Sequence, residues 1–168
     1  MPEPHLPDVD TLIADLAAQI RARLSNGFAL IGVHTGGVWV AERLHTLLNH
    51  AEPIGTLDIS FYRDDFSRIG LHPEVKPSNI PFDVDGRDVV LVDDVLYTGR
   101  TVRAAMNELF DYGRPGSIQL AVLIDRGGRE LPIAAQFIGA TLDLDDRQNI
   151  QLDRSTTGDL KLSLHEQK

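Results

Sequence analysis

One stretch, residues 89–101, does most to limit what this chain can fold into. Four consecutive apolar residues, Val89 to Val92, are followed by two acids, Asp93 and Asp94. A short β-branched run bounded by polar residues is typical of a strand buried on both faces, as in parallel sheets. A Thr98-Gly99 turn comes next. After it, apolar residues recur at the spacing of one helical face, at Val102, Ala105, Met106, Leu109 and Phe110. The stretch therefore predicts a strand, an acidic and hydroxyl-rich loop, and a helix.

The predicted loop lies where α/β proteins bind their ligands, between the carboxyl end of a strand and the amino end of a helix. The unpaired N–H groups and partial positive charge of a helix N-terminus suit a phosphate. Gly99 lets the backbone come close to it, and Thr98 and Thr101 add hydroxyl groups. Two carboxylates would repel a phosphate beside them unless another group lies between the acids and the phosphate. Sugar hydroxyls or a hydrated Mg²⁺ could be that group.

Composition narrows the class of protein. A chain of 168 residues is long enough for one domain with a full core. The absence of cysteine excludes disulfides and thiolate metal sites, and the six histidines have no ligand spacing. No apolar run reaches membrane-spanning length and no leader is visible, so we expect a cytoplasmic protein without a membrane partner. With a net charge of −9, nucleic-acid binding would need a concentrated basic patch, whereas a small anionic substrate needs only Mg²⁺ and a few donors.

The pattern of strand, polar loop and helix also occurs earlier in the chain. A helix is expected from Asp10, a possible N-cap, to Leu24, and a buried strand over residues 28–33. A glycine-rich loop at residues 34–37 follows. The next predicted helix has its inward positions at Val40, Ala41, Leu44, Leu47 and Leu48. Because the carboxyl ends of parallel strands meet at one sheet edge, the two polar loops are expected to form one crevice.

The remaining segments are less regular. Residues 54–61 alternate as a strand does, and no clear periodicity returns before Phe82, so residues 62–81 suit a lid loop or a β-ribbon. A strand over residues 117–124 ends at a third polar loop, residues 125–132, and residues 136–140 suit a short strand. Residues 149–152 and 160–164 are expected to be edge strands.

Three motifs in this order resemble a known family: Tyr-Arg-Asp-Asp at 62–65, Asp-Asp-Val-Leu-Tyr-Thr-Gly-Arg-Thr at 93–101 and Asp-Arg-Gly-Gly-Arg-Glu-Leu-Pro at 125–132. Residues 93–101 look like the phosphoribosyl-diphosphate (PRPP) loop of the type I phosphoribosyltransferases. The whole set looks like the PyrR family, which pairs uracil phosphoribosyltransferase activity with regulation of pyrimidine genes. The resemblance implies a single α/β domain over residues 1–168. A central, mostly parallel, twisted sheet would be flanked by helices, with a flexible lid loop at 62–81 and a small hood that holds the base pocket at 125–168.

The resemblance also assigns roles to residues. The catalytic residues would be Asp93 and Asp94, in contact with the ribose hydroxyls. The stretch assigned to the ribose and 5′-phosphate of PRPP comprises Val89, Val90, Leu91, Val92, Asp93, Asp94, Val95, Leu96, Tyr97, Thr98, Gly99, Arg100 and Thr101. The pyrophosphate is assigned to Thr35, Gly36, Gly37 and Arg63, with the glycines permitting an unusual backbone. The family often has Arg at position 36, so Arg63 is the substitute cation. The base pocket is assigned to Asp125, Arg126 and Gly127, largely through their backbone.

The implied reaction converts uracil and PRPP to UMP and pyrophosphate, with Mg²⁺ held through PRPP rather than by direct protein ligands. The alternative is an RNA-binding attenuator of pyrimidine genes that responds to UMP or UTP. The first helix carries Asp10 and Asp15, and residues 143–147 hold three aspartates and one arginine. Such charges make tight phosphate contacts hard to build, so we predict a transferase with weak or absent RNA binding. A homodimer or higher oligomer is expected from the resemblance alone.

Overall fold

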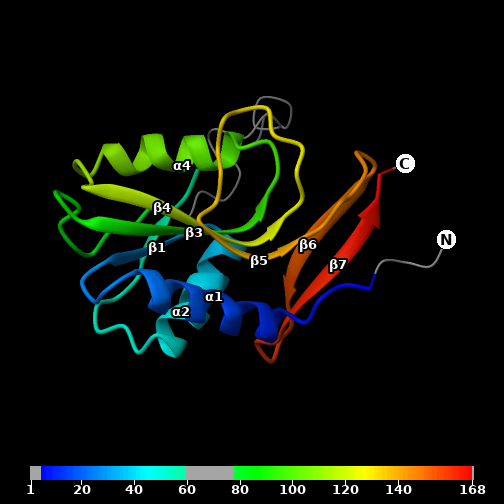
Figure 1. Cartoon of the computed structure of the whole chain (residues 1–168), viewed down its shortest axis with the longest axis horizontal. Helices are drawn as coiled ribbons and strands as arrows, with labels where there is room; N and C mark the ends of the chain where they lie inside the picture. The colour runs from blue at the N-terminus through cyan, green and yellow to red at the C-terminus, as the bar shows by residue number, and fades with distance from the viewer. Residues whose placement is uncertain (1–4, 60–77, 168) are drawn as a thin grey trace.

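The computed structural model describes residues 5–59 and 78–167. Within them, a five-stranded parallel sheet in the order β2-β1-β3-β4-β5 forms the centre of the molecule (Figure 1). Its strands are β1 (Ala29–Val33), β2 (Gly55–Leu57), β3 (Asp88–Leu96), β4 (Ser117–Asp125) and β5 (Phe137–Thr141). The helices of this part are α1 (Val9–Arg23), α2 (Gly36–Leu47) and α4 (Arg100–Phe110). Strands β6 (Gln148–Arg154) and β7 (Leu160–Glu166) pair antiparallel in a separate two-stranded sheet.

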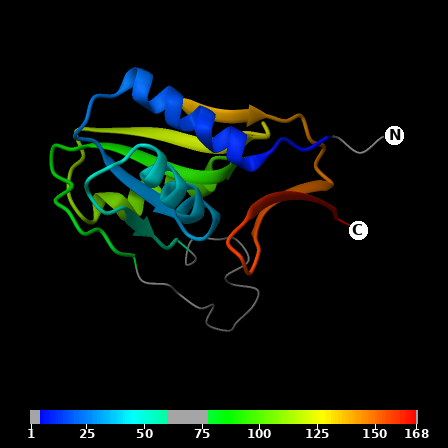
Figure 2. The same cartoon turned by 90° about the horizontal axis from the view of Figure 1, so that it is seen from below.

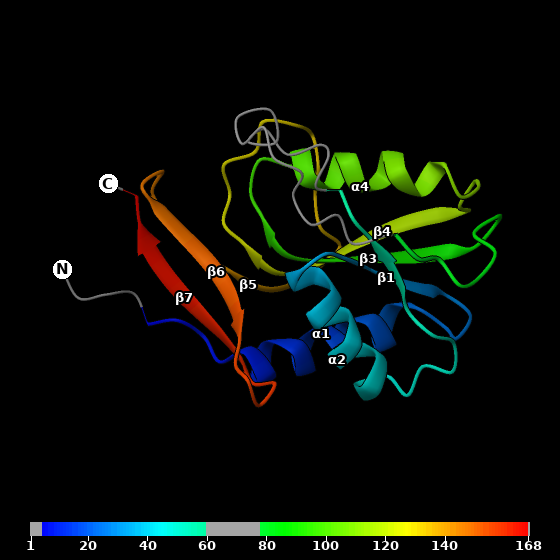
Figure 3. The same cartoon turned by 180° about the vertical axis from the view of Figure 1, so that it is seen from behind.

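Each face of the central sheet buries its own apolar core. Helices α1 and α2 cover one face and α4 covers the other (Figure 3). Along β3, Val90 and Val92 belong to the core with α1 and α2, whereas Val89 and Leu91 belong to the core with α4. Burying each such side chain contributes about 1.5–3 kcal/mol. The prediction of a strand buried on both faces is therefore confirmed.

The end of β3 differs from the prediction. The apolar run stops at Val92, but the strand continues to Leu96, so Asp93 and Asp94 lie within it rather than in the following loop. The reason is unequal pairing on the two sides: β1 pairs with β3 only as far as Val92, whereas β4 pairs with it as far as Leu96. The two acids thus extend past the end of β1 while β4 still supports their backbone.

The helices follow their predicted stripes with differences at their ends. The N-cap of α1 is Asp8, not Asp10: an Asp8 carboxylate oxygen accepts the backbone N–H of Thr11 at 3.0 Å. Leu47 and Phe110, expected to face inward, are 45% and 55% exposed. Each is the last residue of its helix, where no further turn flanks the side chain. No helix in the described ranges is long and apolar enough to cross a membrane.

The C-terminal strands, expected to be edge strands, pair with each other in a sheet of their own, in which each is an edge strand. Figure 2 shows β6 and β7 standing beside the central sheet, near the start of α1. Ile150, Leu152 and Leu162 join the core that α1 and α2 cover, so this small sheet is fastened by its apolar face. Of the predicted strand at 54–61, β2 accounts for Gly55–Leu57, and residues 60 and 61 lie outside the described residues.

Candidate functional site

Three polar loops meet at the carboxyl edge of the central sheet. They follow β1, β3 and β4, which are neighbours and run parallel. The first loop leads into α2, the second leads into α4, and the third spans residues 126–136 before β5. This is the edge at which the sequence predicts a crevice, the position where open α/β sheets bind ligands.

The amino end of α2 is pressed against the two acids of β3. A Cβ at Gly37 would lie 2.5 Å from the Val92 carbonyl oxygen and 3.0 Å from the Asp93 Cα, and a Cβ at Gly36 would overlap the Asp94 carboxylate. Both glycines have helical backbone, and the unusual backbone expected in this loop is the cis peptide bond between His34 and Thr35, directly before them. These glycines are required for close approach. They bring the pyrophosphate candidates next to the carboxylate pair.

The carboxylates themselves are held by the backbone around them. Asp93 is only 5% exposed, and its Oδ1 accepts the backbone N–H of Asp94 at 2.8 Å. Asp94 is half-buried, and its Oδ1 accepts the N–H of Val95 at 2.8 Å. Both side chains are therefore restrained in orientation. Such restraint suits groups that must meet a ligand in a fixed geometry.

The second loop forms an open helix N-terminus. Gly99 is the N-cap of α4 with φ of +94°, a conformation that favours glycine, and as a glycine it has no side chain to cap the helix. The Thr98 hydroxyl accepts the N–H of Arg100 at 3.2 Å. The first N–H groups of α4 point out of the helix end, and three residues separate that end from β3. This arrangement is a ready anion site.

Hydrogen bonds join the third loop to the second. The N–H groups of Glu130 and Leu131 both donate to the Thr98 carbonyl oxygen, at 2.9 and 3.1 Å. Arg129 donates to the carbonyl oxygen of Tyr97 at 2.9 Å and to the Asp125 carboxylate at 2.6 Å. Burial alone would raise the pKa of Asp125, but hydrogen bonds from Arg129 and Gly127 and the charge of Arg129 together lower that pKa below its ordinary value.

Comparisons with known proteins agree with this geometry. The model of the phosphoribosyl transferase domain matches residues 5–152. A curated relative from Nitrosococcus oceani, named "Bifunctional protein PyrR", is 53% identical over 158 residues, with 90% of this chain and 89% of the relative covered. A protein of the same name from Pseudomonas paraeruginosa is 53% identical over 151 residues, covering 88% of this chain and 89% of the relative. The chain belongs to the PyrR family.

Solved structures support the fold. A hypoxanthine-guanine phosphoribosyltransferase from Bacillus anthracis matches with a TM-score of 0.67 at 20% identity, covering 85% of this chain and 86% of that one. The hypoxanthine phosphoribosyltransferase of Trypanosoma cruzi matches with a TM-score of 0.60 at 22% identity, covering 80% and 77%. The predicted type I phosphoribosyltransferase fold is confirmed, and this PyrR-family chain is a phosphoribosyltransferase.

The structure brings some predicted site residues to the crevice and not others. The side chains of Val89 to Val92 are at most 1% exposed, so they support the PRPP loop from within the two cores and do not face the crevice. Leu96 is equally buried. Arg63 and residues 62–77 of the predicted lid lie outside the described residues. Sequence reasoning assigned Arg129 no role; Asp125, four residues earlier, is the local signal that could have found it, whereas its partner Tyr97 lies 32 residues away.

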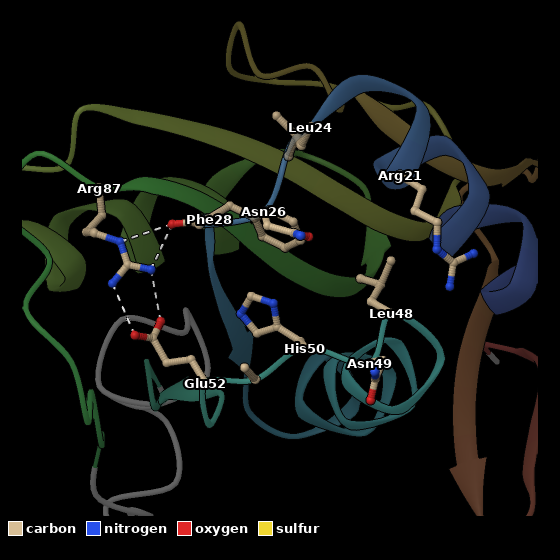
Figure 4. Close-up of a pocket in the computed structure, with 11 residues that line it drawn as sticks. Arg21, Leu24, Asn26, Phe28, Leu48, Asn49, His50, Glu52 and Arg87 are labelled. Carbon is tan, nitrogen blue, oxygen red and sulfur yellow. Dashed lines mark hydrogen bonds and ion pairs between the residues drawn. The ribbon is translucent and has the colours of Figure 1, made fainter.

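A separate cavity of about 410 Å³ opens at the opposite edge of the sheet, beside the residues that precede β1 and β3 (Figure 4). Its most constrained charge is already used within the protein. The Arg87 guanidinium donates to the Gly27 carbonyl oxygen and to both carboxylate oxygens of Glu52, each at 2.9–3.2 Å. The cavity lies at the opposite end of the strands from the three loops and shares no residue with them.

We predict that replacing Arg129 weakens the fold through Asp125. Folding lowers the pKa of Asp125 below its ordinary value of 3.8. Its carboxylate therefore stabilises the folded protein at pH values above 3.8, and this contribution is lost as the pH falls through the pKa of the folded state. At neutral pH, Arg129→Met should lower the free energy of unfolding by about 1–3 kcal/mol, because it leaves Asp125 and the carbonyls of Tyr97, Gly127 and Ile133 short of a donor. Urea unfolding measures this difference, and its Asp125-dependent part should shrink only below pH 3.8.

The matched control is Arg100→Met, which breaks the exposed ion pair between Arg100 and Glu130 at 3.0 Å. An exposed pair contributes about 0–1 kcal/mol. Equal losses in the two variants would contradict the special position of Arg129, as would an Asp125 pKa, followed by NMR, that does not rise in Arg129→Met.

Proposed function

We propose that this chain is a uracil phosphoribosyltransferase that converts uracil and PRPP to UMP and pyrophosphate with Mg²⁺. One observation carries the proposal: the glycine-led start of α2 is packed against Asp93 and Asp94, and the strand that holds this pair leads through residues 97–99 into the N-terminus of α4. A ligand that fits this set needs hydroxyl groups for the acids and anionic groups for two helix ends. PRPP has both. The preference for uracil rests on the motif order that resembles the PyrR family.

In the proposed complex the ribose hydroxyls bind the carboxylates of Asp93 and Asp94. The 5′-phosphate takes the backbone N–H groups and hydroxyls of residues 97–101, where the positive φ of Gly99 opens the helix end. Hydrogen bonds to a charged phosphate are stronger than hydrogen bonds between two neutral groups. Val89 to Val92 act only by fixing the strand from which the acids extend.

The pyrophosphate of PRPP is proposed to lie over Thr35, Gly36 and Gly37, with Arg63 as an added cation. Mg²⁺ commonly keeps several waters and is bound by one or two carboxylates together with substrate phosphates. Here Mg²⁺ is proposed to be held through PRPP rather than by direct protein ligands, while Asp93 and Asp94 bind the ribose hydroxyls. When bound, the metal neutralises charge on the leaving pyrophosphate.

The base pocket is proposed at Asp125, Arg126 and Gly127, within a hood formed by residues 125–168 of this single domain. The N–H of Arg126 donates to the Leu96 carbonyl oxygen at 3.1 Å, and that of Gly127 donates to the Asp125 carboxylate at 3.0 Å. Because both donors are used internally, this segment is fixed. A fixed backbone is suited to reading the edge of a planar base.

The chemistry is displacement at the anomeric carbon of the ribose. The bond from that carbon to pyrophosphate breaks with its electron pair leaving on pyrophosphate, and N1 of uracil, having lost its proton, forms the new bond. Positive charge develops on the ribose in between, and the adjacent carboxylates stabilise it electrostatically. Residues 62–81 are the proposed lid that excludes water. No covalent nucleophile is needed.

The alternative, an RNA-binding attenuator that responds to UMP or UTP, has less support. The basic residues of α1 are engaged by the protein: Arg21 donates to the Leu47 carbonyl oxygen, and Arg23 donates to that of Gln136 and lies over the Phe137 ring. In the segment before β6, Asp143, Asp145 and Asp146 are all exposed. RNA binding needs several free cations on one face. The proposed enzyme is cytoplasmic and a homodimer or higher oligomer.

We predict that Asp94→Asn abolishes UMP formation from uracil, PRPP and Mg²⁺, a loss of at least about a hundredfold, since the carboxylate meets charge that develops in the reaction. Removing Mg²⁺ with EDTA should have a comparable effect on the wild-type protein. Asp143→Asn, which changes an exposed aspartate outside the crevice, is the control and should retain activity. A fully active, folded Asp94→Asn protein would remove the central assignment.

RNA binding is predicted to be weak and nonspecific. A filter-binding titration with pyrimidine-gene leader RNA, repeated at rising salt with and without UMP, should show no specific complex, because an acidic surface releases few counterions. Tight binding that depends on UMP would favour the regulatory alternative over the one proposed.

A further inference from the structure

Arg126 is a buried cation, only 6% exposed. Among residues 5–59 and 78–167, no carboxylate lies within 4.0 Å of it to form an ion pair. Its Nε is buried and makes no hydrogen bond to those residues. Buried charges in proteins are ordinarily paired, because an unpaired one is costly. A residue that keeps such an arrangement beside a binding crevice calls for a functional reason.

The contacts of Arg126 lead to the PRPP loop rather than to the base pocket. Its guanidinium carbon lies 4.1 Å from the centre of the Tyr97 ring, a cation–π distance. Its Nη2 donates to the Asp145 carbonyl oxygen at 3.0 Å. The Tyr97 hydroxyl in turn donates to the Asp146 carboxylate at 3.4 Å. Arg126 thus joins the end of β4, the PRPP loop and the segment that leads into β6.

The fit around Tyr97 is close on another side too. Gly128 has φ of +75°, and a Cβ there would overlap the Tyr97 ring, with its Cδ2 only 2.8 Å away. Tyr97 is followed directly by Thr98 and Gly99, which form the amino end of α4. Fixing the ring therefore restrains the backbone that is proposed to hold the 5′-phosphate.

We propose that the Arg126 side chain is a positioning residue for PRPP: it holds Tyr97, and its uncompensated positive charge is balanced when the anionic 5′-phosphate binds at the adjacent loop. The proposal rests on the proposed function, in which the backbone of Arg126, not its side chain, lines the base pocket. The positioning role predicts that loss of the Arg126 side chain weakens PRPP binding and leaves uracil binding nearly unchanged.

The test compares Arg126→Met and Arg126→Lys with the wild-type protein. For Arg126→Met, the KM for PRPP and the Kd of PRPP with Mg²⁺ by calorimetry should both rise about tenfold, the equivalent of one desolvated cation–π contact. The KM for uracil and kcat should change less than about threefold, and Arg126→Lys, which keeps the charge without the planar stack, should weaken PRPP about threefold. Arg147→Met, an exposed arginine on the neighbouring segment, is the matched control and should match the wild type.

Tyr97→Leu should weaken PRPP as Arg126→Met does, and the double variant should be little worse than either, because both remove one contact. An equal rise in the KM for uracil would show that Arg126 contacts the base, and unchanged PRPP affinity in folded Arg126→Met would show a structural role only; either result overturns the proposal. If Arg126→Met does not fold, Arg126→Lys decides, and a wild-type Kd for PRPP contradicts the proposal.

Failure of the two proposals can be told apart. A wild-type protein that binds PRPP but forms no UMP contradicts uracil transfer, and the calorimetric titrations still decide the role of Arg126. A wild-type protein with full activity whose Arg126 variants bind PRPP normally contradicts only the positioning role.

Discussion

The site depends on unequal backbone pairing along β3. Strand β1 pairs with β3 as far as Val92, and β4 pairs with it through Leu96, so Asp93 and Asp94 extend beyond β1 with ladder support on one side only. The space beyond β1 is taken by the start of α2. That helix can begin there because Gly37 has no side chain to meet the Val92 carbonyl. Strand pairing therefore fixes where Asp93 and Asp94 lie, and the lack of a side chain at Gly37 lets the amino end of α2 approach them.

The C-terminal part of the chain contacts both α2 and the loop after β3. Toward α2, Arg154 lies over the Trp39 ring at 4.8 Å, and Arg43 donates to the Gly158 carbonyl oxygen. In the segment before β6, the Asp145 carbonyl oxygen accepts from Arg126, and the Asp146 carboxylate accepts from Tyr97 of the loop after β3. Residues 145–158 thus link α2 to the loop that leads into α4.

Local pattern was sufficient for much of the fold and insufficient where partners are distant in sequence. Apolar runs and helical spacing predicted β1, β3, β4, α1, α2 and α4, and motif order pointed to the family. The strand end at Val92 was wrong because pairing with β4 is non-local. Alternation predicted β6 and β7 as edge strands but does not reveal that they pair with each other in a separate sheet. The buried state of Arg126 had no sequence signal either, since its partners Tyr97 and Asp145 come from other segments.

The most direct test of the site is a crystal structure of this chain with PRPP and Mg²⁺. The ribose hydroxyls should lie within about 3 Å of the carboxylates of Asp93 and Asp94, at hydrogen-bond distance. The 5′-phosphate should lie at the amino end of α4 and the pyrophosphate over Gly36 and Gly37. PRPP bound away from these two acids, for example in the cavity beside Arg87, would contradict the assignment of the carboxyl edge as the active site.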